Sequence, residues 1–319
     1  MNTATYVLPI KSLSLDGFDE LTGYLQRLRK IVPRVEVIIV DGSPAEIFTE
    51  HARCWGAIVR HLAPGPLRCL NGKVRGTLTG IAAASHDKII VADDDVRYDA
   101  GALHRVIDAL DHADVVRPQN YFVPDTWHTL LDSGRALLNR VTGGDWPGTL
   151  GLRRGILRGG YSGNVLFENL ELVRTMLALG GKEFVAYDIF VARRPPTFRH
   201  FLDQRVRQAY DEFARPHRMA VELLVAPLLA VAILKRRMGL LAIAAVAAFA
   251  AAEIGRLRAG AGRYFSILAS MAAPLWILER GICAWLAIVT RIRYGGVPYA
   301  GSVIRVAATP LRVLARQVV

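Results

Sequence analysis

Residues 88–95 read KIIVADDD, a short apolar run that ends on three consecutive acidic residues. An apolar run of this length is typical of a strand that is buried on both faces of a parallel sheet. Three adjacent carboxylates cannot be buried without partners, so they must be solvated, cap the backbone or bind a cation. The stretch therefore predicts a buried strand whose carboxyl end carries an acidic site.

The residues before this stretch alternate between apolar strand patterns and helical patterns. Tyr6–Ile10 and Val35–Val40 predict strands, and the apolar residues of Phe18–Ile31 recur at helical spacing. A third strand is predicted at 57–62, and a helix at 71–84 leads into the acidic strand. This order predicts an α/β fold with a mostly parallel sheet, which binds its ligands at the carboxyl ends of the strands.

Two further motifs stand at the ends of predicted elements. VDGS at 40–43 closes the second strand, and NGK at 71–73 opens the helix before the acidic strand. Taken singly, an Asx turn and a solvated lysine explain them. Their order along the chain, together with the acidic strand, favours one shared ligand site.

The apolar residues are concentrated in the last third of the chain. The runs 219–234 and 238–254 have about the minimum length for crossing a hydrocarbon core of roughly 30 Å, and three basic residues at 235–237 join them. They predict a transmembrane hairpin at about 219–254. Glu279-Arg280 interrupts the next run, and each such charge costs about 2.5 to 3.5 kcal/mol at the bilayer centre. We therefore expect two shorter interfacial or re-entrant helices at about 264–290.

The net charge and the spacing of the cysteines indicate which class of protein this is. The net charge is +12, and many of the basic residues cluster around the apolar runs, which favours membrane headgroups over nucleic acid. The three cysteines have no metal-ligand spacing, and the N-terminus lacks the pattern of a signal peptide. We expect a multi-pass protein of the inner (plasma) membrane, with an α/β domain at 1–214 in the cytoplasm and membrane helices and a tail at 215–319.

The ordered motifs resemble those of glycosyltransferase family 2, whose members include cellulose and hyaluronan synthases and ceramide glucosyltransferase. The acidic strand end resembles the family's DxD motif. This resemblance implies that Asp95 and Asp93 form the site for Mg²⁺ or Mn²⁺ on the nucleotide diphosphate, with Asp93 toward the nucleoside. It also implies that Asp41 faces the nucleobase and that Lys73 meets the donor's negative charge, although Gly42 replaces the second aspartate of the family's turn.

A later segment, RHFLDQRVRQAY at 199–210, resembles the QxxRW motif of the membrane-integrated enzymes in this family. Gln204 and Arg207 match the motif, whereas Gln208 stands at the tryptophan position. On a helix, Gln204 and Arg207 share one face. The resemblance implies that they hold the leaving diphosphate and the acceptor entrance, and the missing tryptophan argues against processive polymer synthesis.

Inverting transfer also needs a carboxylate that accepts a proton from the acceptor hydroxyl. The family places it after a glycine-rich acceptor segment, matched here by 159–167, and after a helix that ends in Gly-Gly, matched at 180–181. Asp188 is the first acid with the right surroundings, and Glu168 is the alternative at the more usual distance from Gln204. The remaining candidates are Glu171, Glu183 and Asp145.

The resemblance implies a GT-A-like nucleotide-sugar-binding α/β domain, followed by transmembrane and interfacial helices. It implies an inverting glycosyltransferase that moves a sugar from a nucleoside-diphosphate sugar to a lipid-linked or membrane-proximal hydroxyl. The expected partners are this donor, a lipid or glycan acceptor and membrane lipids, without nucleic acid. Two alternatives stay open: a nucleotidyltransferase, which would need a glycine-rich basic signature that PIKS at 9–12 does not supply, and a non-catalytic scaffold derived from a glycosyltransferase.

Overall fold

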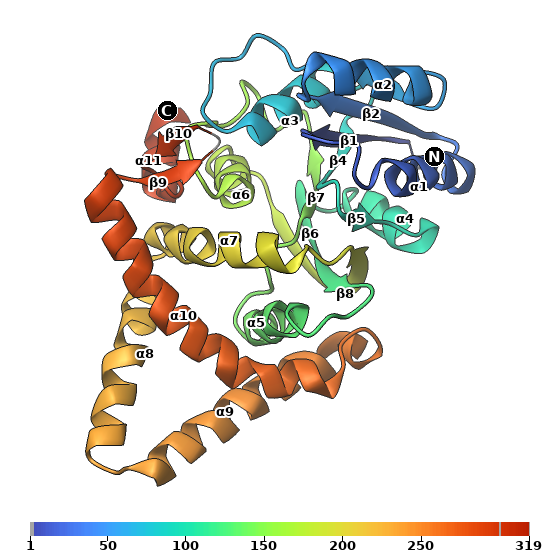
Figure 1. The fold of residues 1–319 in the computed structure, drawn as a ribbon. Coiled ribbons are helices and arrows are strands. Elements are labelled where there is room, and N and C mark those ends of the chain that lie inside the picture. Colours follow the sequence, from blue (N-terminus) through green and yellow to red (C-terminus); the bar gives the residue numbers. More distant parts are fainter. Residues whose placement is uncertain (1–2, 300, 319) are drawn as a thin grey trace.

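The computed structural model describes residues 3–299 and 301–318 and contains an α/β body with three long apolar helices attached to it (Figure 1). The body is built on a sheet with the strand order β3-β2-β1-β4-β7-β6-β8-β5. Its strands are β1 (Ala4–Ile10), β2 (Val35–Asp41), β3 (Arg60–Leu62), β4 (Lys88–Ala92), β5 (Val96–Arg97), β6 (Val115–Phe122), β7 (Thr149–Arg153) and β8 (Glu183–Arg193). The helices of the body are α1 (Phe18–Ile31), α2 (Ala45–Trp55), α3 (Gly72–Ala83), α4 (Ala100–Ala109), α5 (Thr129–Val141), α6 (Glu168–Ala178), α7 (Phe198–Tyr210) and the short 3₁₀ helix η1 (Asp211–Ala214).

The pairing of the strands confirms the mostly parallel α/β sheet. β1 pairs in parallel with β2 and β4, β2 with β3, and β6 with β8. β7 lies between β4 and β6 and is antiparallel to both. The acidic residues that follow β4 therefore lie at the same edge of the sheet as the ends of β1 and β2.

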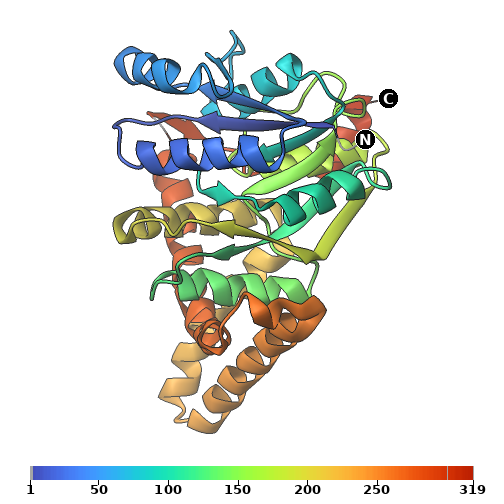
Figure 2. The ribbon, with the colours of Figure 1, turned by 90° about the vertical axis from the view of Figure 1, so that its right-hand side faces the viewer.

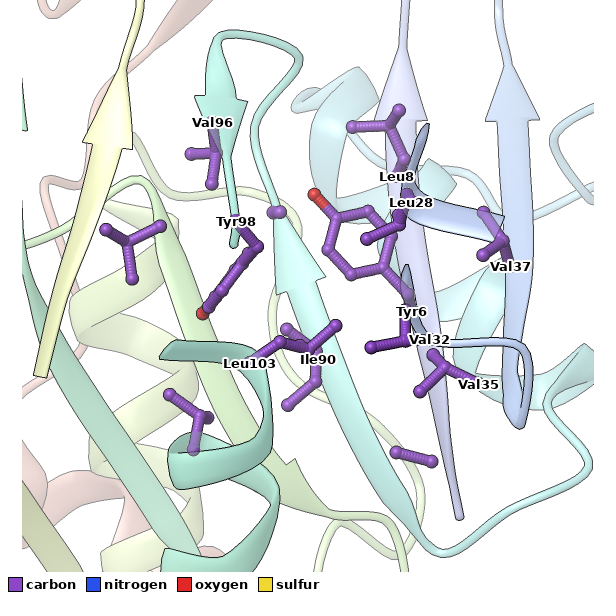
Figure 3. Close-up of a cluster of buried hydrophobic side chains, with 14 of the residues drawn as sticks. Tyr6, Leu8, Leu28, Val32, Val35, Val37, Ile90, Val96, Tyr98 and Leu103 are labelled. Carbon is purple, nitrogen blue, oxygen red and sulfur yellow. The ribbon is translucent and has the colours of Figure 1, made fainter. Parts of the chain in front are cut away.

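Apolar layers on both faces hold the sheet between helices. On one face, Tyr6 and Ile90 of neighbouring strands pack with Leu28 of α1 and Leu103 of α4 (Figure 3). On the other face, α3 approaches closely, since a Cβ atom at Gly80 would lie 2.3 Å from Val7 Cγ1. This close packing fixes the start of α3 beside the ends of β1 and β2.

The structure differs from the sequence-based elements mainly around residues 45–62. The helix α2 was not predicted, and the third strand covers Arg60–Leu62 rather than 57–62. The apolar pattern does not predict α2 because the helix buries only two side chains, His51 and Trp55, and one of them is polar. The predicted strand Val35–Val40 and helix Phe18–Ile31 are confirmed.

Three helices, α8 (Pro216–Leu234), α9 (Met238–Leu257) and α10 (Ile267–Tyr294), are long and apolar enough to cross a membrane, with the 3₁₀ helix η2 (Arg258–Arg263) between the last two. α8 and α9 form the predicted hairpin, which projects from the body (Figures 1 and 2). Many of its apolar side chains are exposed. α10 is one continuous helix, which corrects the expectation of two shorter pieces at 264–290. The charge does not break it because Arg280 is buried against α7 rather than in lipid.

The hairpin and α10 are packed directly onto the α/β body. Gly255 of α9 touches α5, since a Cβ atom there would lie 2.0 Å from the carbonyl oxygen of Leu137. The buried Arg140 of α5 donates to the carbonyl oxygens of Gly255 at 2.9 Å and Arg258 at 2.6 Å. Backbone contact and buried hydrogen bonds thus join the body to the apolar helices.

The end of the chain returns to the body as β9 (Val297–Tyr299), β10 (Ser302–Ile304) and α11 (Leu311–Val318). Leu166 N donates to Val306 O at 3.0 Å and Phe167 N to Ala307 O at 2.8 Å. The expected division at 214/215 therefore separates two segments that pack together.

We expect Gly255→Ala to lower the thermal unfolding temperature of the detergent-purified protein. The added methyl group meets the backbone of α5, and overpacking of this kind typically costs about 1 to 3 kcal/mol. Gly239→Ala, in the same helix, is the matched control because no atom lies within 4 Å of its Cβ position. Equal unfolding temperatures for both variants would contradict the close packing of α9 on α5.

Candidate active site

A cleft of about 570 Å³ opens where β1, β2 and β4 end. This volume is typical of sites for small molecules and cofactors. Its walls come from the start of α3, the acidic turn after β4, the loop 146–148, the residues 166–169, and α7 with η1. Two residues of the apolar helix α10, Trp276 and Arg280, also line it, so one cleft reaches from the sheet edge to the membrane-type helices.

The acidic turn and the predicted lysine meet in this cleft. Lys73 Nζ lies 2.5 Å from Asp93 Oδ1 and 2.7 Å from Glu168 Oε1. Asn71 caps α3 by accepting a hydrogen bond from Lys73 N at 3.0 Å, which fixes the start of the helix. Burial lowers the pKa of Lys73, but the charges of Asp93 and Glu168 outweigh burial and raise the pKa above its usual range. Lys73 therefore stays cationic.

A second cation, Arg193, reaches the acidic turn from the end of β8. Its Nη2 lies 2.6 Å from Asp95 Oδ2 and 3.6 Å from Asp93 Oδ2. Burial lowers the pKa of Arg193, but the two carboxylates outweigh it and raise the pKa. No motif in the sequence indicates Arg193, because its place at this edge depends on the register of β8.

The donor set of the acidic turn fits a divalent metal ion. Asp93 and Asp95 offer carboxylate oxygens, which Mg²⁺ and Mn²⁺ prefer. Gly148 lets the side chains of Asp93 and Arg193 pack directly against its backbone, since a Cβ atom there would lie 2.7 Å from Asp93 Oδ2 and 3.0 Å from Arg193 Cζ. An ion bound here has to compete with Arg193 for the carboxylate of Asp95.

Gln204 and Arg207 of α7 both line the cleft, as their shared helix face predicts. The guanidinium of Arg207 lies 4.5 Å from the ring centroid of Tyr299 in β9. Gln208, at the position of the missing tryptophan, accepts a hydrogen bond from Arg280 Nη2 at 3.4 Å. The roles of Gln204 and Arg207 in the reaction stay predictions.

Asp41 does not line the cleft, which argues against the predicted contact with the nucleobase. Its buried carboxylate lies 2.6 Å from His51 Nδ1 and 3.0 Å from His61 Nε2, and accepts from Ser43 N at 2.9 Å. Burial alone would raise the pKa of Asp41, but hydrogen bonds from His61, Ser43 and His51 lower it. Asp41 thus holds the turn after β2, and Gly42 is exposed to the cleft instead.

Asp188 also lies away from the cleft, which argues against its predicted role as general base. It is half exposed on β8 and forms an ion pair with Arg105 of α4. Residue 193 at the end of β8 reaches the cleft, so Asp188 lies about 16 Å earlier along the strand. A general base must reach the acceptor hydroxyl. Of the alternatives, Glu168 lines the cleft, whereas Glu171, Glu183 and Asp145 do not.

A further carboxylate in the cleft, Asp211 of η1, was not found by sequence analysis. Its Oδ1 is buried and has no hydrogen-bond partner among the residues that the structure describes. Burial raises the pKa of Asp211 to about 8, and the nearby charges are those of Arg207, Glu168, Arg215 and Glu212. A carboxyl group with a pKa near neutrality is suited to general acid–base chemistry.

Comparisons with known proteins bear on the family resemblance and on the fold. Residues 18–158 match the family model "Glycosyl transferase family 2". A mannosyltransferase from Pyrobaculum calidifontis, solved in complex with GDP-Man and Mn²⁺, has 16% sequence identity and a TM-score of 0.52, covering 88% of this chain and 86% of that chain. This likeness supports the fold.

Two further solved structures are less similar and add no argument. Mannosyl-3-phosphoglycerate synthase from Rubrobacter xylanophilus has 12% identity and a TM-score of 0.44, covering 64% of this chain and 71% of that chain. Glucosyl-3-phosphoglycerate synthase from Mycobacterium tuberculosis has 16% identity and a TM-score of 0.42, covering 62% and 74%. No match was found among the curated proteins.

We expect Asp95→Asn to weaken Mn²⁺ binding by at least about tenfold, because the amide keeps the shape of the side chain but removes its charge. Titration calorimetry with Mn²⁺ and a nucleoside diphosphate measures this change. Asp188→Asn, the same substitution outside the cleft, serves as the control and should bind Mn²⁺ as the wild type does. Unchanged Mn²⁺ affinity in Asp95→Asn would rule out this carboxylate as a ligand.

Proposed function

We propose that the chain transfers a sugar from a nucleoside-diphosphate sugar to a membrane-proximal hydroxyl, with inversion at the anomeric carbon, because residues 18–158 match the model of glycosyltransferase family 2 and the fold is GT-A-like. The family match favours transfer over the nucleotidyltransferase and scaffold alternatives. The acidic turn with Lys73 and Arg193 provides the donor end of the cleft.

The extent of the cleft is the observation that supports a membrane-proximal acceptor. Its donor end lies at the strand ends, and its other end is walled by Trp276 and Arg280 of α10. The outer face of α10 exposes apolar side chains, including Ile282 at 59% and Leu275 at 59%. An acceptor held in the membrane beside α10 would therefore enter the cleft past Trp276 and Arg280 and so reach the donor.

The charged residues divide the chemistry of transfer between them. A divalent ion on Asp93 and Asp95 would neutralise the charge that develops on the departing diphosphate. Lys73 and Arg207, cations on the same cleft, would hold the diphosphate oxygens. As the bond from the anomeric carbon to the diphosphate breaks, the acceptor oxygen bonds to the opposite face of that carbon and passes its proton to Asp211.

Asp211 suits the role of base better than Glu168 does. Burial would raise the pKa of Glu168, but the charge and the hydrogen bond of Lys73 lower it. Glu168 is thus held as the counter-ion of Lys73 and has little affinity for a proton. Asp211 has a raised pKa, and one of its oxygens has no hydrogen-bond partner among the described residues, so its ionised form accepts a proton more readily.

We expect Asp211→Asn to lower transfer by a factor of about 10² to 10⁴ while donor binding persists, because the amide cannot accept the proton. In the wild type, kcat/KM should rise with pH through about 8, since the base works only when ionised, and the variant should lose this limb. Steady-state assays across pH measure both effects.

Two variants serve as comparisons for the base. Glu168→Gln should leave kcat nearly unchanged and lower KM for the donor slightly, because it frees Lys73 from one carboxylate and leaves the cation more available to the diphosphate. Asp188→Asn should behave as the wild type. If Asp211→Asn is active and Glu168→Gln binds the donor but does not transfer the sugar, Glu168 rather than Asp211 is the base.

We also propose that α8 and α9 hold the protein in the inner (plasma) membrane, with the cleft on the cytoplasmic side. Their exposed side chains include Leu234 at 82% and Ile243 at 66%, which an aqueous surface would not favour over such an area. We expect the protein to sediment with membranes and to need detergent for extraction. Full-length protein that stays monodisperse without detergent would contradict this placement.

A further inference from the structure

Arg280 occupies an unusual position for a charged residue. It lies in the middle of the apolar helix α10, is only 2% exposed, and lines the cleft. Burying a charge is costly unless hydrogen bonds and an opposite charge compensate it. A buried arginine in such a helix is therefore expected to have its donors fully paired.

The donors of Arg280 are mostly unpaired. Its Nη2 donates to Gln208 Oε1 over 3.4 Å, a long hydrogen bond. Its Nε and Nη1, and the Nε1 of Trp276 one turn away, have no hydrogen-bond partner among the described residues. The guanidinium lies 5.3 Å from the ring centroid of Trp276, so the free donors belong to two neighbouring side chains that both line the cleft.

The charge of the cleft is unbalanced at this same end. The donor end has four cations and four carboxylates: Lys11, Lys73, Arg75 and Arg193 against Asp93, Asp94, Asp95 and Glu168. The walls from α5, α7 to α8, and α10 have five arginines and three carboxylates: Arg135, Arg207, Arg215, Arg218 and Arg280 against Asp132, Asp211 and Glu212. Asp132 is also paired with Arg205 at 3.0 Å, and Glu222 of α8, which lies near Arg280 behind this wall, is shared with Arg218 at 4.0 Å, so each compensates Arg280 only partly.

We propose that Arg280 and Trp276 form a subsite for the phosphate group of an anionic acceptor lipid. This inference rests on the proposed function and names the class of its acceptor: a phospholipid that also carries the hydroxyl that receives the sugar. Guanidinium N–H groups pair well with phosphate oxygens, and the indole N–H adds a third donor to the same group. The exposed Leu278 and Ile282 lie on the opposite, outer face of α10, so lipid chains packed there would run along the same helix that carries Arg280 on its inner face.

The test measures lipid binding without turnover. Dihexanoylphosphatidic acid, used below its micelle concentration, is titrated calorimetrically into the detergent-purified full chain. We expect Arg280→Gln to weaken its binding at least about tenfold, whereas Arg293→Gln, which removes a charge from the exposed end of α10, should bind as the wild type does. Equal affinities in the wild type and Arg280→Gln would overturn the proposal.

Two milder variants cover the case in which Arg280→Gln does not fold. Arg280→Lys keeps the charge but loses the planar fork, and Trp276→Phe removes only the indole N–H. Both should weaken lipid binding by a few fold, and wild-type affinity in both would overturn the subsite. Binding of a nucleoside diphosphate with Mn²⁺ should be the same in all variants, which shows that the donor end is intact.

Further ligands identify the source of the phosphate. Inorganic phosphate should bind more weakly than dihexanoylphosphatidic acid, and equal affinity would overturn the assignment to a lipid. Octyl glucoside, a neutral amphiphile, should not compete. Donor turnover is assayed separately: lipid binding that depends on Arg280 without any sugar transfer would refute the proposed function and leave the subsite standing.

Discussion

Three carboxylates at the end of one buried strand repel each other, and the sheet edge can hold them only if cations come from elsewhere in the chain. Lys73 meets Asp93, and Arg193 meets Asp95 and Asp93. This requirement fixes the start of α3 and the end of β8 around the acidic turn. Gly148 completes the arrangement, because a larger residue would collide with Asp93 and Arg193.

Motifs whose geometry is local could be predicted from the sequence. The strand Lys88–Ala92 and the helix after Asn71 are set by apolar spacing and by a cap, so the meeting of Lys73 with the acidic turn followed from their order. Gln204 and Arg207 share a face because both stand on one helix. The hairpin of α8 and α9 followed from run length alone.

Positions that depend on distant parts of the chain could not be predicted. Asp188 looked like a base because it follows Gly-Gly, but its place is set by the register of β8 with β6. His51 and His61 hold the carboxylate of Asp41 away from the cleft. His51 lies on α2, a helix that the apolar pattern does not indicate. Arg280 reads as a break in a hydrophobic run, and only the packing of α10 on α7 shows that it faces the cleft.

The return of the chain end to the body has a consequence for the order of assembly. The wall around Phe167 and Glu168 is braced by Ala307, and Arg207 stacks on Tyr299. These two braces are synthesised after all three apolar helices. On a ribosome-bound chain these two contacts of the cleft wall therefore cannot form until all three apolar helices have been synthesised.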